Sequence, residues 1–415
     1  MQDGAVAHSY YPRTLDGVLR RATKTFPAIL VTGPRQTGKT TLLRTAWGKG
    51  RVFVSLEQPA VRARAQSDPV AFLKENPPPL ILDEVQYVPE LLHHIKDDID
   101  QNRRPGRYLM TGSQSLALMQ GIGQSLAGRV AVLTLLPFSA SELSGQRTPS
   151  LASLLARVFG PARPSRQVRT SLSLGDWLLR GAYPEPRANP KVDHQLWCAS
   201  YIQTYLERDV RTLLKVGDLN SFSRFLRLCA TRTGQILNLS DLARDTGVSV
   251  PTAKSWLSVL EASHEVFLLP PHFANFGKRL IKAPKLYFTD TALAAYLAGI
   301  TSEQALLHGP MAGALFETAV VVAWRKAFLH RGQIPNLFYW RSSDGLEVDL
   351  ILERDRKLFA IEAKLTSTPT PGHAATLAKW MKLAGDSVGG AVIQANLDTP
   401  TTLVPGIRAI PWWWV

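Results

Sequence analysis

The feature that most constrains the fold of this 415-residue chain is the stretch from Ala28 to Leu43, AILVTGPRQTGKTTLL. A short apolar run leads into a loop that opens at Gly33 and closes at Gly38, Lys39 and Thr40. This spacing fits the pattern G-x-x-x-x-G-K-[ST], and the flanking residues predict the strand and the helix that a phosphate-binding loop requires. The alternative is a glycine-rich turn that binds no ligand.

The residue types of this loop suit a nucleoside triphosphate. Glycines let backbone N–H groups turn toward phosphate oxygens, Lys39 brings a cation to the outer phosphates, and the Thr40 hydroxyl can hold Mg²⁺. The N-terminus of the following helix adds partial positive charge. We therefore predict a site for ATP and Mg²⁺. Its nucleotide contacts are expected from Gly33, Pro34, Arg35, Gln36, Thr37, Gly38, Lys39, Thr40 and Thr41.

A second apolar run, PLILDE at residues 79 to 84, ends in two carboxylates. This form is typical of a buried parallel strand that delivers acidic side chains to the edge of a sheet. We expect Asp83 to hold Mg²⁺, directly or through water, and Glu84 to polarise the attacking water. A strand that simply leaves the core has the same pattern, but its place downstream of the phosphate loop favours the ATP site.

Five short apolar runs predict an α/β fold class, with a mostly parallel sheet that helices cover on both faces. The expected strands are residues 28–32, 51–56, 79–83, 107–111 and 130–135. Ligands of such sheets bind beyond the carboxyl ends of the strands. The phosphate loop, Asp83 and Ser113 should therefore meet at one edge.

Two further positions are candidates for this site. Ser113 or Gln114 follows the fourth strand and is expected to contact the γ-phosphate or its water, although a Gly-Ser turn fits the local sequence equally well. Arg129, in SLAGRV, can complete the phosphate site of its own subunit or of a neighbour. The alternative for Arg129 is an arginine that faces solvent.

Composition limits the classes of protein and partner. Hydrophobic residues make up 45% and charged residues 20% of the chain, which suits two to four globular domains. No apolar run reaches the ~20 residues that span a bilayer, and two cysteines give no disulfide framework, so we expect a cytoplasmic protein without membrane contact. The net charge of +15 makes nucleic acid the leading candidate partner, unless the source proteome is generally basic, and we expect DNA.

The middle of the chain changes pattern. Residues 144–175 are rich in Ser, Pro and Arg and suggest a partly ordered connector, and residues 193–214 suggest a helix. A helix-turn-helix pattern follows. It consists of a short helix at LSDLARDT with Ser240 as the expected N-cap, a turn at Gly247 and a second helix at residues 250–262. The segment FLLPP after it suits the strand of a winged version. Such a module binds DNA or packs against protein. The loop that would form the wing carries Lys278, Arg279, Lys282 and Lys285.

The last hundred residues hold a second group of candidate catalytic residues. EVDLILE and KLFAIEAKL predict neighbouring strands, so Asp349 can meet Glu362 at one edge while Lys364 shares the face of Glu362. Two acids and a lysine suit phosphodiester hydrolysis, with Asp349 and Glu362 as Mg²⁺ ligands and Lys364 orienting or deprotonating a water. Glu317, from a preceding helix, can assist. The alternative is a polar strand face with a surface ion pair.

The C-terminal tryptophans are expected to have a structural role. Trp412, Trp413 and Trp414 come at the end of the chain, in RAIPWWWV. We expect them to cover a sheet edge or a seam between domains, with nucleobase stacking as the alternative.

A series of motifs, taken in order along the chain, resembles that of a group of prokaryotic AAA+ ATPases. The motifs are GPRQTGKTTLL, LILDE, TGSQSL, SLAGRV, GAYPE, YLERDV, KLYFTDTAL, LFE and EVDLI…IEAK. The C-terminal part of these ATPases is a domain of unknown function with a restriction-endonuclease-like fold. The resemblance covers nearly the whole chain. It implies a P-loop AAA+ domain at 1–140, a connector and helical segment at 141–220, a winged-helix domain at 221–295 and a PD-(D/E)xK nuclease-like domain at 296–415.

The resemblance also implies residue roles. It makes Lys39 and Thr40 the phosphate and Mg²⁺ positions, Asp83 and Glu84 the Mg²⁺ and water positions, and Ser113 the sensor. Arg129 looks like the arginine of a GR motif, and the set Asp349, Glu362 and Lys364 matches the nuclease motif. Because AAA+ sites usually lie between subunits, the chain is expected to form a homo-oligomer, as a hexameric ring.

Two functions follow as hypotheses. The first is an ATP-hydrolysing motor that binds and remodels DNA, of the helicase or branch-migration type used in repair and recombination, with a metal-dependent nuclease module. The second is a nucleotide-gated signalling or defence switch, whose C-terminal domain binds a protein partner.

Overall fold

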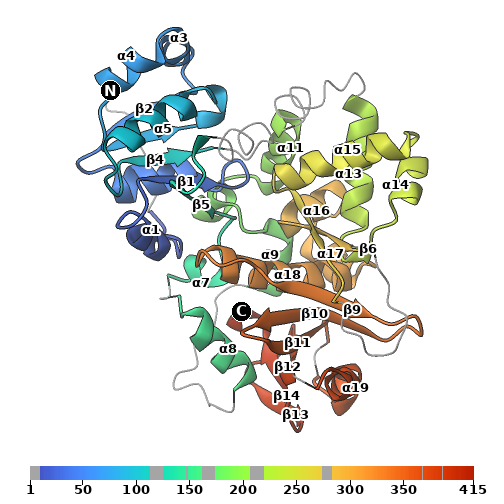
Figure 1. Ribbon diagram of the computed structural model, residues 1–415. Coiled ribbons are helices and arrows are strands. Elements are labelled where there is room, and N and C mark those ends of the chain that lie inside the picture. Colours follow the sequence, from blue (N-terminus) through green and yellow to red (C-terminus); the bar gives the residue numbers. More distant parts are fainter. Residues whose placement is uncertain are drawn as a thin grey trace.

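The computed structural model describes residues 10–112, 125–145, 148–160, 173–205, 219–272, 283–366, 368–385 and 387–415. Figure 1 shows an N-terminal α/β unit at the upper left, a helical middle region at the right and a C-terminal sheet below them. No helix in these ranges is long and apolar enough to cross a membrane.

The N-terminal unit is built on a five-stranded parallel sheet, as predicted. Its strands lie in the order β2-β3-β4-β1-β5, and every neighbouring pair is parallel. The strands are β1 (Ala28–Thr32), β2 (Val52–Ser55), β3 (Leu80–Asp83), β4 (Tyr108–Thr111) and β5 (Val130–Thr134). The carboxyl ends of β3, β4 and β1 therefore lie side by side.

Strand alternation divides the residues of this sheet between two cores. Leu30 and Leu82 join one core with helix α5, and Val31 and Ile81 join the other with helix α1. The helices of this unit are α1 (Asp16–Ala22), α2 (Lys39–Thr41), the π-helix η1 (Leu42–Ala46), α3 (Pro59–Ser67), α4 (Pro69–Glu75), the 3₁₀ turn η2 (Val85–Tyr87) and α5 (Leu91–Gln101).

The segment predicted to be a partly ordered connector contains a regular helix. Helix α8 (Leu151–Phe159) packs against two strands of the C-terminal sheet, β12 (Ser387–Gln394) and β14 (Ile407–Pro411). Its apolar residues fall on one side and face this sheet; they are Leu151, Leu154, Leu155 and Val158. The sequence did not indicate this helix at residues 151–159, and the role of residues 144–175 as a connector stays a prediction. The helices of this part of the chain are α7 (Ala140–Leu143), α8 (Leu151–Phe159), α9 (Leu174–Arg180), α10 (Pro184–Ala188) and α11 (His194–Tyr205). The expected helix at 193–214 is described as far as Tyr205.

The middle region runs helix, strand, helix, helix, strand, strand. Its elements are α13 (Leu219–Thr231), β6 (Gln235–Ile236), α14 (Leu239–Thr246), α15 (Val250–Ala262), β7 (Val266–Leu269) and β8 (Lys285–Phe288). The three strands form one antiparallel sheet in the order β6-β8-β7. Both predicted helices are present, and Gly247 ends α14 in the left-handed conformation.

Two details of the predicted helix-turn-helix differ. The side chain that caps α14 is Asn238, which accepts from the Asp241 N–H, and not Ser240. Lys285 is not in a loop but begins strand β8, where it is 2% exposed. The other three expected wing cations, Lys278, Arg279 and Lys282, lie outside the described residues.

The C-terminal sheet is mixed and six-stranded, in the order β13-β14-β12-β11-β10-β9. Helix α19 covers one face, and helices α18 and α8 cover the other. Its strands are β9 (Leu337–Arg341), β10 (Glu347–Arg354), β11 (Lys357–Lys364), β12 (Ser387–Gln394), β13 (Thr401–Val404) and β14 (Ile407–Pro411). The remaining helices are α16 (Thr291–Leu297), α17 (Glu303–His308), α18 (Ala312–Leu329), α19 (Ala375–Ala384) and the 3₁₀ turns η4 (Pro371–Ala374) and η5 (Trp412–Trp414).

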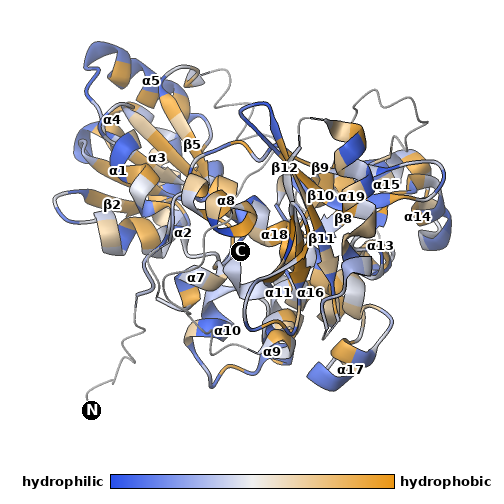
Figure 2. Ribbon diagram, turned by 90° about the horizontal axis from the view of Figure 1, so that it is seen from below, coloured by the Kyte–Doolittle hydropathy of each residue, from blue (hydrophilic) through white to orange (hydrophobic). Residues whose placement is uncertain are grey.

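One apolar core joins the middle region to the C-terminal sheet. It contains Phe222 of α13, Trp324 of α18 and Ile361 of β11. Figure 2 shows α18 and the strands beside it as predominantly hydrophobic. The buried Trp412 packs on Trp177 of α9, with ring centroids 6.0 Å apart, so the C-terminal tryptophans close a seam between segments as expected.

The turn between α9 and α10 gives a test of this packing. Gly181 has φ 61° and ψ −147°, and a Cβ placed there would lie 2.0 Å from the carboxylate of Asp290. We expect Gly181→Ala to lower the free energy of unfolding by about 3 kcal/mol or more, because the side chain has no room.

The matched control is Gly299→Ala. Gly299 also has a positive φ but has open space around it, so only the left-handed backbone is penalised, at about 1 kcal/mol. Denaturant unfolding measures both variants, and equal losses would contradict the packing described for Gly181.

Candidate functional site

The predicted phosphate loop joins the end of β1 to the start of α2. Gly33, with φ 140°, has no room for a side chain, since a Cβ there would lie 2.1 Å from the Leu135 carbonyl oxygen. Gly38 caps α2 with φ 87°. Lys39 is 5% exposed, and its ammonium group donates to the carbonyl oxygens of Gly33 at 3.0 Å and Pro34 at 2.7 Å. The loop therefore curves around its own lysine.

Asp83 collects three hydroxyl groups at the carboxyl edge of the sheet. Its Oδ1 accepts from Thr40 Oγ1 at 2.7 Å and from Thr111 Oγ1 at 2.6 Å, and its Oδ2 accepts from Ser55 Oγ at 3.3 Å. These residues meet because the parallel strands β2, β3, β4 and β1 all end here. The Thr40 hydroxyl and the Asp83 carboxylate are hard oxygen donors of the kind that Mg²⁺ prefers, so the residues present fit this ion.

Glu84 follows Asp83 in the left-handed conformation, with φ 60°. Its N–H donates to Thr111 Oγ1 at 3.0 Å, and its carboxylate accepts from the Gln86 side chain. The threonine at the end of β4 thus fixes both acidic residues. Sequence reasoning missed Thr111, although its position at the end of a predicted strand, two residues before Ser113, was a usable signal. Ser113 and Gln114 lie outside the described residues.

A cavity of about 230 Å³ opens beside the phosphate loop. Residues of the loop and helix, Gly38, Thr41 and Thr45, form one wall. The remaining lining comes from Tyr10, Tyr11 and Arg13 ahead of α1, from Phe138, and from Pro184, Glu185 and Ala188 of α10. The cavity therefore combines aromatic and apolar side chains with the charged Arg13 and Glu185, and its aromatic part beside the predicted nucleotide contact Thr41 suits a flat heterocycle.

The structure does not bring Arg129 to the phosphate loop of its own chain. Parallel pairing aligns Ala28 with Val130, so Arg129 lies at the amino ends of the strands, while the loop follows their carboxyl ends. About 13 Å of strand separates the two positions. The guanidinium group instead pairs with Asp100, with N···O distances of 2.6 and 2.9 Å. Contact with a neighbouring subunit stays a prediction.

The second group of predicted residues does converge. Strands β10 and β11 are antiparallel with Leu350 opposite Ile361, so Asp349 and Glu362 come next along the ladder. Asp349 Oδ2 accepts from the Ala363 N–H at 2.8 Å, and Lys364 Nζ donates to Glu362 Oε1 at 2.7 Å. The register of β10 against β9 shifts between Val348 and Ile351, so the ladder is irregular in the segment that contains Asp349, and such irregularities are common beside functional sites.

Glu317 reaches the same place from α18, as expected, but it is held by residues that the sequence did not indicate. Its Oε1 accepts from Lys285 Nζ at 2.8 Å and from the Tyr287 hydroxyl at 2.5 Å. Lys285 also pairs with Glu347. We call Glu317, Asp349 and Glu362, with Lys285 and Lys364, the carboxylate site. Because Lys285 and Tyr287 belong to β8, this site is built from the middle region and the C-terminal sheet together.

The charges of the carboxylate site act on one another. Burial and the neighbouring carboxylates of Glu317 and Glu362 raise the pKa of Asp349 well above its usual range. Although burial alone lowers the pKa of Lys364, the Glu362 carboxylate raises it. Glu362 is 7% exposed, and its Oε2 has no hydrogen-bond partner.

These features test the fit of a metal ion. The buried Glu362 Oε2, which has no hydrogen-bond partner, and the neighbouring Asp349 carboxylate together offer two oxygen ligands for a metal ion. In the described part of the chain, however, no group of three His, Cys, Asp or Glu side chains is arranged to hold a metal. The residues therefore fit an ion such as Mg²⁺ that keeps several of its waters, and they do not form a closed protein cage.

The buried cation gives a test of the carboxylate site. Lys285→Met should lower the free energy of unfolding by about 3–5 kcal/mol, because Glu317 and Glu347 would lose the buried charge that compensates them. Thermal and denaturant unfolding measure the change, and Glu317→Gln in the same chain should restore part of it. Lys364→Met is the control, since its side chain is 36% exposed, and a loss as large as that of Lys285→Met would refute the assignment.

Family models match three parts of the chain. Residues 25–144 match an AAA domain, residues 171–304 match a domain of unknown function (DUF8612) and residues 312–415 match a domain of unknown function (DUF4143). The AAA domain contains the phosphate loop and Asp83, which supports nucleotide binding by a P-loop ATPase domain. A restriction-endonuclease-like fold for residues 312–415 stays a prediction.

Among solved structures, the chain is similar to the Walker-type ATPase PABY2304 of Pyrococcus abyssi, with 16% identity, a TM-score of 0.40 and coverage of 70% of this chain and 99% of that chain. It is also similar to the Thermotoga maritima RuvB Holliday junction branch migration motor, with 17% identity, a TM-score of 0.30 and coverage of 62% and 87%. Both likenesses are too weak to carry an argument.

Sequence relatives are more informative. The chain is 34% identical over 395 residues to the uncharacterized protein Rv2008c of Mycobacterium tuberculosis (strain ATCC 25618 / H37Rv), covering 95% of this chain and 80% of that protein. The uncharacterized protein Mb2031c of Mycobacterium bovis (strain ATCC BAA-935 / AF2122/97) matches with the same values. The chain therefore belongs to the family of Rv2008c and Mb2031c, and its N-terminal part is an AAA domain.

Proposed function

We propose that this protein hydrolyses ATP in its N-terminal unit and uses the energy to move or remodel DNA. The observation that carries the proposal is the set of hydrogen bonds from Thr40 and Thr111 to Asp83, beside the loop that encloses Lys39. A turn that bound no ligand would have no need for these three polar groups at the edge of a buried sheet. Their grouping supports an ATP and Mg²⁺ site.

The residues of the nucleotide site have complementary roles in hydrolysis. Lys39 offsets the negative charge of the outer phosphates once these replace the Gly33 and Pro34 carbonyl oxygens as its partners. Thr40 and Asp83 would hold Mg²⁺, which neutralises charge on the phosphate oxygens when bound. Glu84 orients and polarises the attacking water, and Thr111 keeps Asp83 and Glu84 in register. The cavity beside Thr41 would receive the nucleobase.

Removal of the loop cation tests this assignment. Lys39→Ala should reduce ATP turnover at least ~100-fold, because it removes the ammonium group that the loop encloses and that would face the outer phosphates, while the thermal unfolding midpoint stays close to that of the wild type. Lys364→Ala is the matched control, since it removes a lysine far along the chain and should keep full turnover. Normal turnover by Lys39→Ala would exclude this loop as the active site.

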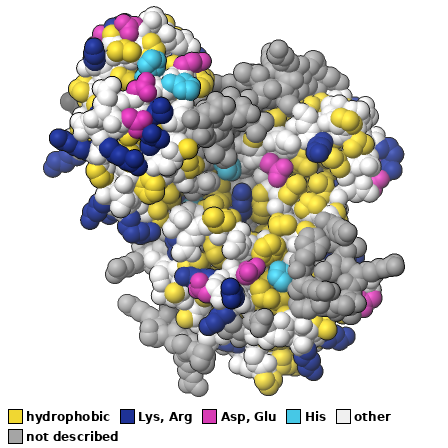
Figure 3. Space-filling view, viewed as in Figure 1, with side chains coloured by type: hydrophobic (Ala, Val, Ile, Leu, Met, Phe, Trp, Pro, Cys, Tyr) yellow, Lys and Arg dark blue, Asp and Glu magenta, His cyan; other side chains and the backbone are white. Residues whose placement is uncertain are grey.

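DNA as the partner is supported by charge. The chain has a net charge of +15, and Figure 3 shows Lys and Arg side chains gathered along one side of the N-terminal unit. The order of elements from α13 to β8 supports the winged-helix prediction. The exposed face of α15, however, includes only one cation, Lys254, beside Ser255 and Ser258, which favours backbone contact over sequence readout.

The same ATPase assay tests the partner. The wild-type rate is expected to rise with duplex, single-stranded or branched DNA at low salt and to lose this stimulation as salt increases. Lys39→Ala should stay inactive with every DNA. A wild-type rate that no DNA changes, together with no binding at moderate salt, would remove the DNA part of the proposal and keep the ATPase.

The C-terminal sheet is proposed to act on phosphodiesters. Three features support a nuclease-like module. The sheet contains both antiparallel and parallel strand pairs, its ladder is irregular in the segment that contains Asp349, and Glu362 pairs with Lys364. Asp349 and Glu362 would hold the metal ion, which supplies a charge for the phosphate oxygens when bound. Lys364 orients the attacking water from the face it shares with Glu362.

Plasmid cleavage tests this module. Wild-type protein is expected to cut DNA with Mg²⁺ or Mn²⁺, and Lys364→Ala should cut at least ~100-fold more slowly, since the water loses the group that orients it. Lys39→Ala is the matched control, because it keeps the carboxylate site and should cut like the wild type, whereas a contaminating nuclease would also cut in the Lys364→Ala sample. If wild type and Lys364→Ala cut equally, or neither cuts, the module is not a nuclease.

Assembly completes the proposal. Arg129 lies at the amino ends of the parallel strands, and the phosphate loop lies at their carboxyl ends. One copy can therefore present Arg129 to the nucleotide of the next copy in a closed ring. This arrangement supports a homo-oligomer, and a hexamer is the number proposed.

A second candidate function is a nucleotide-gated switch, whose C-terminal domain binds a protein partner. One observation favours it. Helix α18, which carries Glu317 of the carboxylate site, ends at Leu329, and the next residue, His330, lies beside buried Glu142 of the N-terminal unit. Nucleotide binding can therefore be transmitted to the C-terminal sheet whether or not that sheet cuts DNA.

A further inference from the structure

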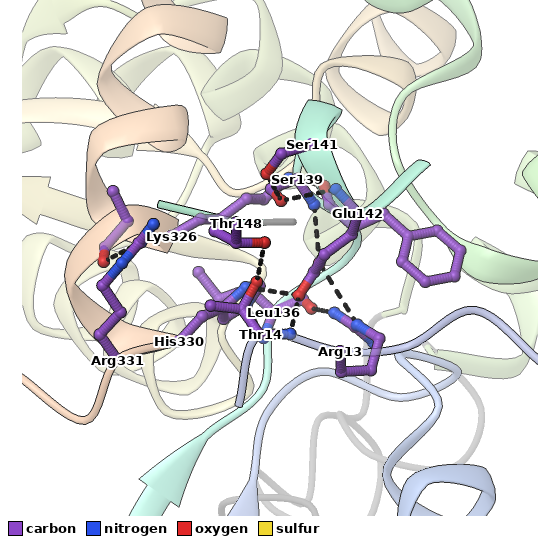
Figure 4. Close-up of polar contacts among 12 residues, drawn as sticks. Arg13, Thr14, Leu136, Ser139, Ser141, Glu142, Thr148, Lys326, His330 and Arg331 are labelled. Carbon is purple, nitrogen blue, oxygen red and sulfur yellow. Dashed lines mark hydrogen bonds and ion pairs between the residues drawn. The ribbon is translucent and has the colours of Figure 1, made fainter. Parts of the chain in front are cut away.

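Three buried charged or polar side chains connect segments that lie far apart in the sequence (Figure 4). Arg13 precedes α1, Glu142 belongs to α7, and His330 directly follows α18. The side chains are 3%, 1% and 1% exposed. Burial of charge is costly unless the groups pair and bond fully, so this cluster has to be specific in geometry.

Arg13 holds the phosphate loop. Its Nη1 donates to the Thr37 carbonyl oxygen at 2.8 Å, and its Nη2 donates to the Leu136 carbonyl oxygen at 2.7 Å. The guanidinium group also packs on the Phe138 ring, 4.7 Å from its centroid. Thr37 immediately precedes Gly38, so the position of Arg13 sets the backbone of the loop next to Lys39.

Glu142 in turn holds Arg13. Its Oε2 lies 3.3 Å from Arg13 Nε and accepts from the Ser139 N–H at 2.9 Å, while its Oε1 accepts from the Thr14 N–H at 2.7 Å. The carboxylate therefore meets Arg13 in one orientation, and it fixes the chain on both sides of the arginine.

His330 joins this cluster to the C-terminal part of the molecule. Its Nε2 accepts from the Leu136 N–H at 3.1 Å, which assigns the ring proton to Nδ1. That nitrogen lies 3.4 Å from Glu142 Oε1, close enough for an electrostatic contact but without a hydrogen bond. The residue after α18 is thus hydrogen-bonded to the Leu136 segment and lies against the Glu142 carboxylate, and both of these contact Arg13.

We propose that Arg13 is a positioning residue for the phosphate loop, and that His330 acts through Glu142 and Arg13 to set the affinity of the N-terminal unit for nucleotide. This inference rests on the proposed ATP site. It adds a regulatory path, because α18 has His330 at one end and Glu317 of the carboxylate site near the other. A movement of α18 would reach the phosphate loop through buried contacts, which are the hydrogen bonds at Leu136 and Thr37 and the close charge contacts of Glu142.

The test measures the Kd of a fluorescent ATP analogue. Arg13→Met should raise the Kd about tenfold, the effect of losing one hydrogen bond from a charged donor, and His330→Leu should raise it about threefold to tenfold. Glu142→Gln should fall between them. Arg13→Lys, which keeps a cation, replaces Arg13→Met if circular dichroism shows that the methionine variant does not fold.

Thr318→Val is the matched control. Thr318 lies on the same helix, is 0% exposed and bonds to Thr233 of the middle region at 3.0 Å, but it takes no part in the cluster. Its removal loosens α18 without reaching Arg13, so the Kd should stay unchanged. The double variant Arg13→Met with His330→Leu should have the Kd of Arg13→Met alone, because the histidine acts through the arginine.

The outcomes separate the inference from the function on which it rests. Wild-type protein that binds no nucleotide removes both. If the wild type binds nucleotide, an unchanged Kd in His330→Leu overturns the inference alone. So does an equal rise in Thr318→Val, or an additive effect in the double variant, because each would show general loosening of the helix.

Discussion

The carboxylate of Asp83 is the group on which the N-terminal half of the molecule depends. It lies at the end of a strand whose other residues are wholly buried, and hydroxyl groups from the neighbouring strand and from the phosphate loop converge on it. A carboxylate that is 4% exposed needs such hydrogen-bond donors to offset the cost of its burial. The register of the parallel strands, the turn at Gly33 and the start of α2 all agree with this requirement.

Local patterns were sufficient to predict much of the architecture. Apolar runs of strand length gave the five parallel strands, and the spacing of Gly33, Gly38 and Lys39 gave the loop between β1 and α2. Alternation along β11 also gave the shared face of Glu362 and Lys364. Each of these features depends on residues close in sequence, where the geometry of a strand or turn determines the outcome.

Features that depend on distant segments could not be predicted in the same way. Lys285 looked like a wing cation, yet the pairing of β8 with β6 and β7 buries it against Glu317. Arg13 gives no motif, because its partners Thr37, Leu136 and Glu142 come together only in the folded chain. Whether Arg129 lies at the amino ends or the carboxyl ends of the strands likewise depends on the direction of β5, which is set by its pairing with β1.

The origin of Lys285 has a practical consequence for work on the C-terminal sheet. A fragment that starts after β8 would keep Asp349, Glu362 and Lys364 but would lack the ammonium group between Glu317 and Glu347. Its carboxylates would repel one another without compensation, and the apolar surface that faces the middle region would be open to water. An inactive or insoluble excised fragment would therefore say little about the chemistry of the intact chain.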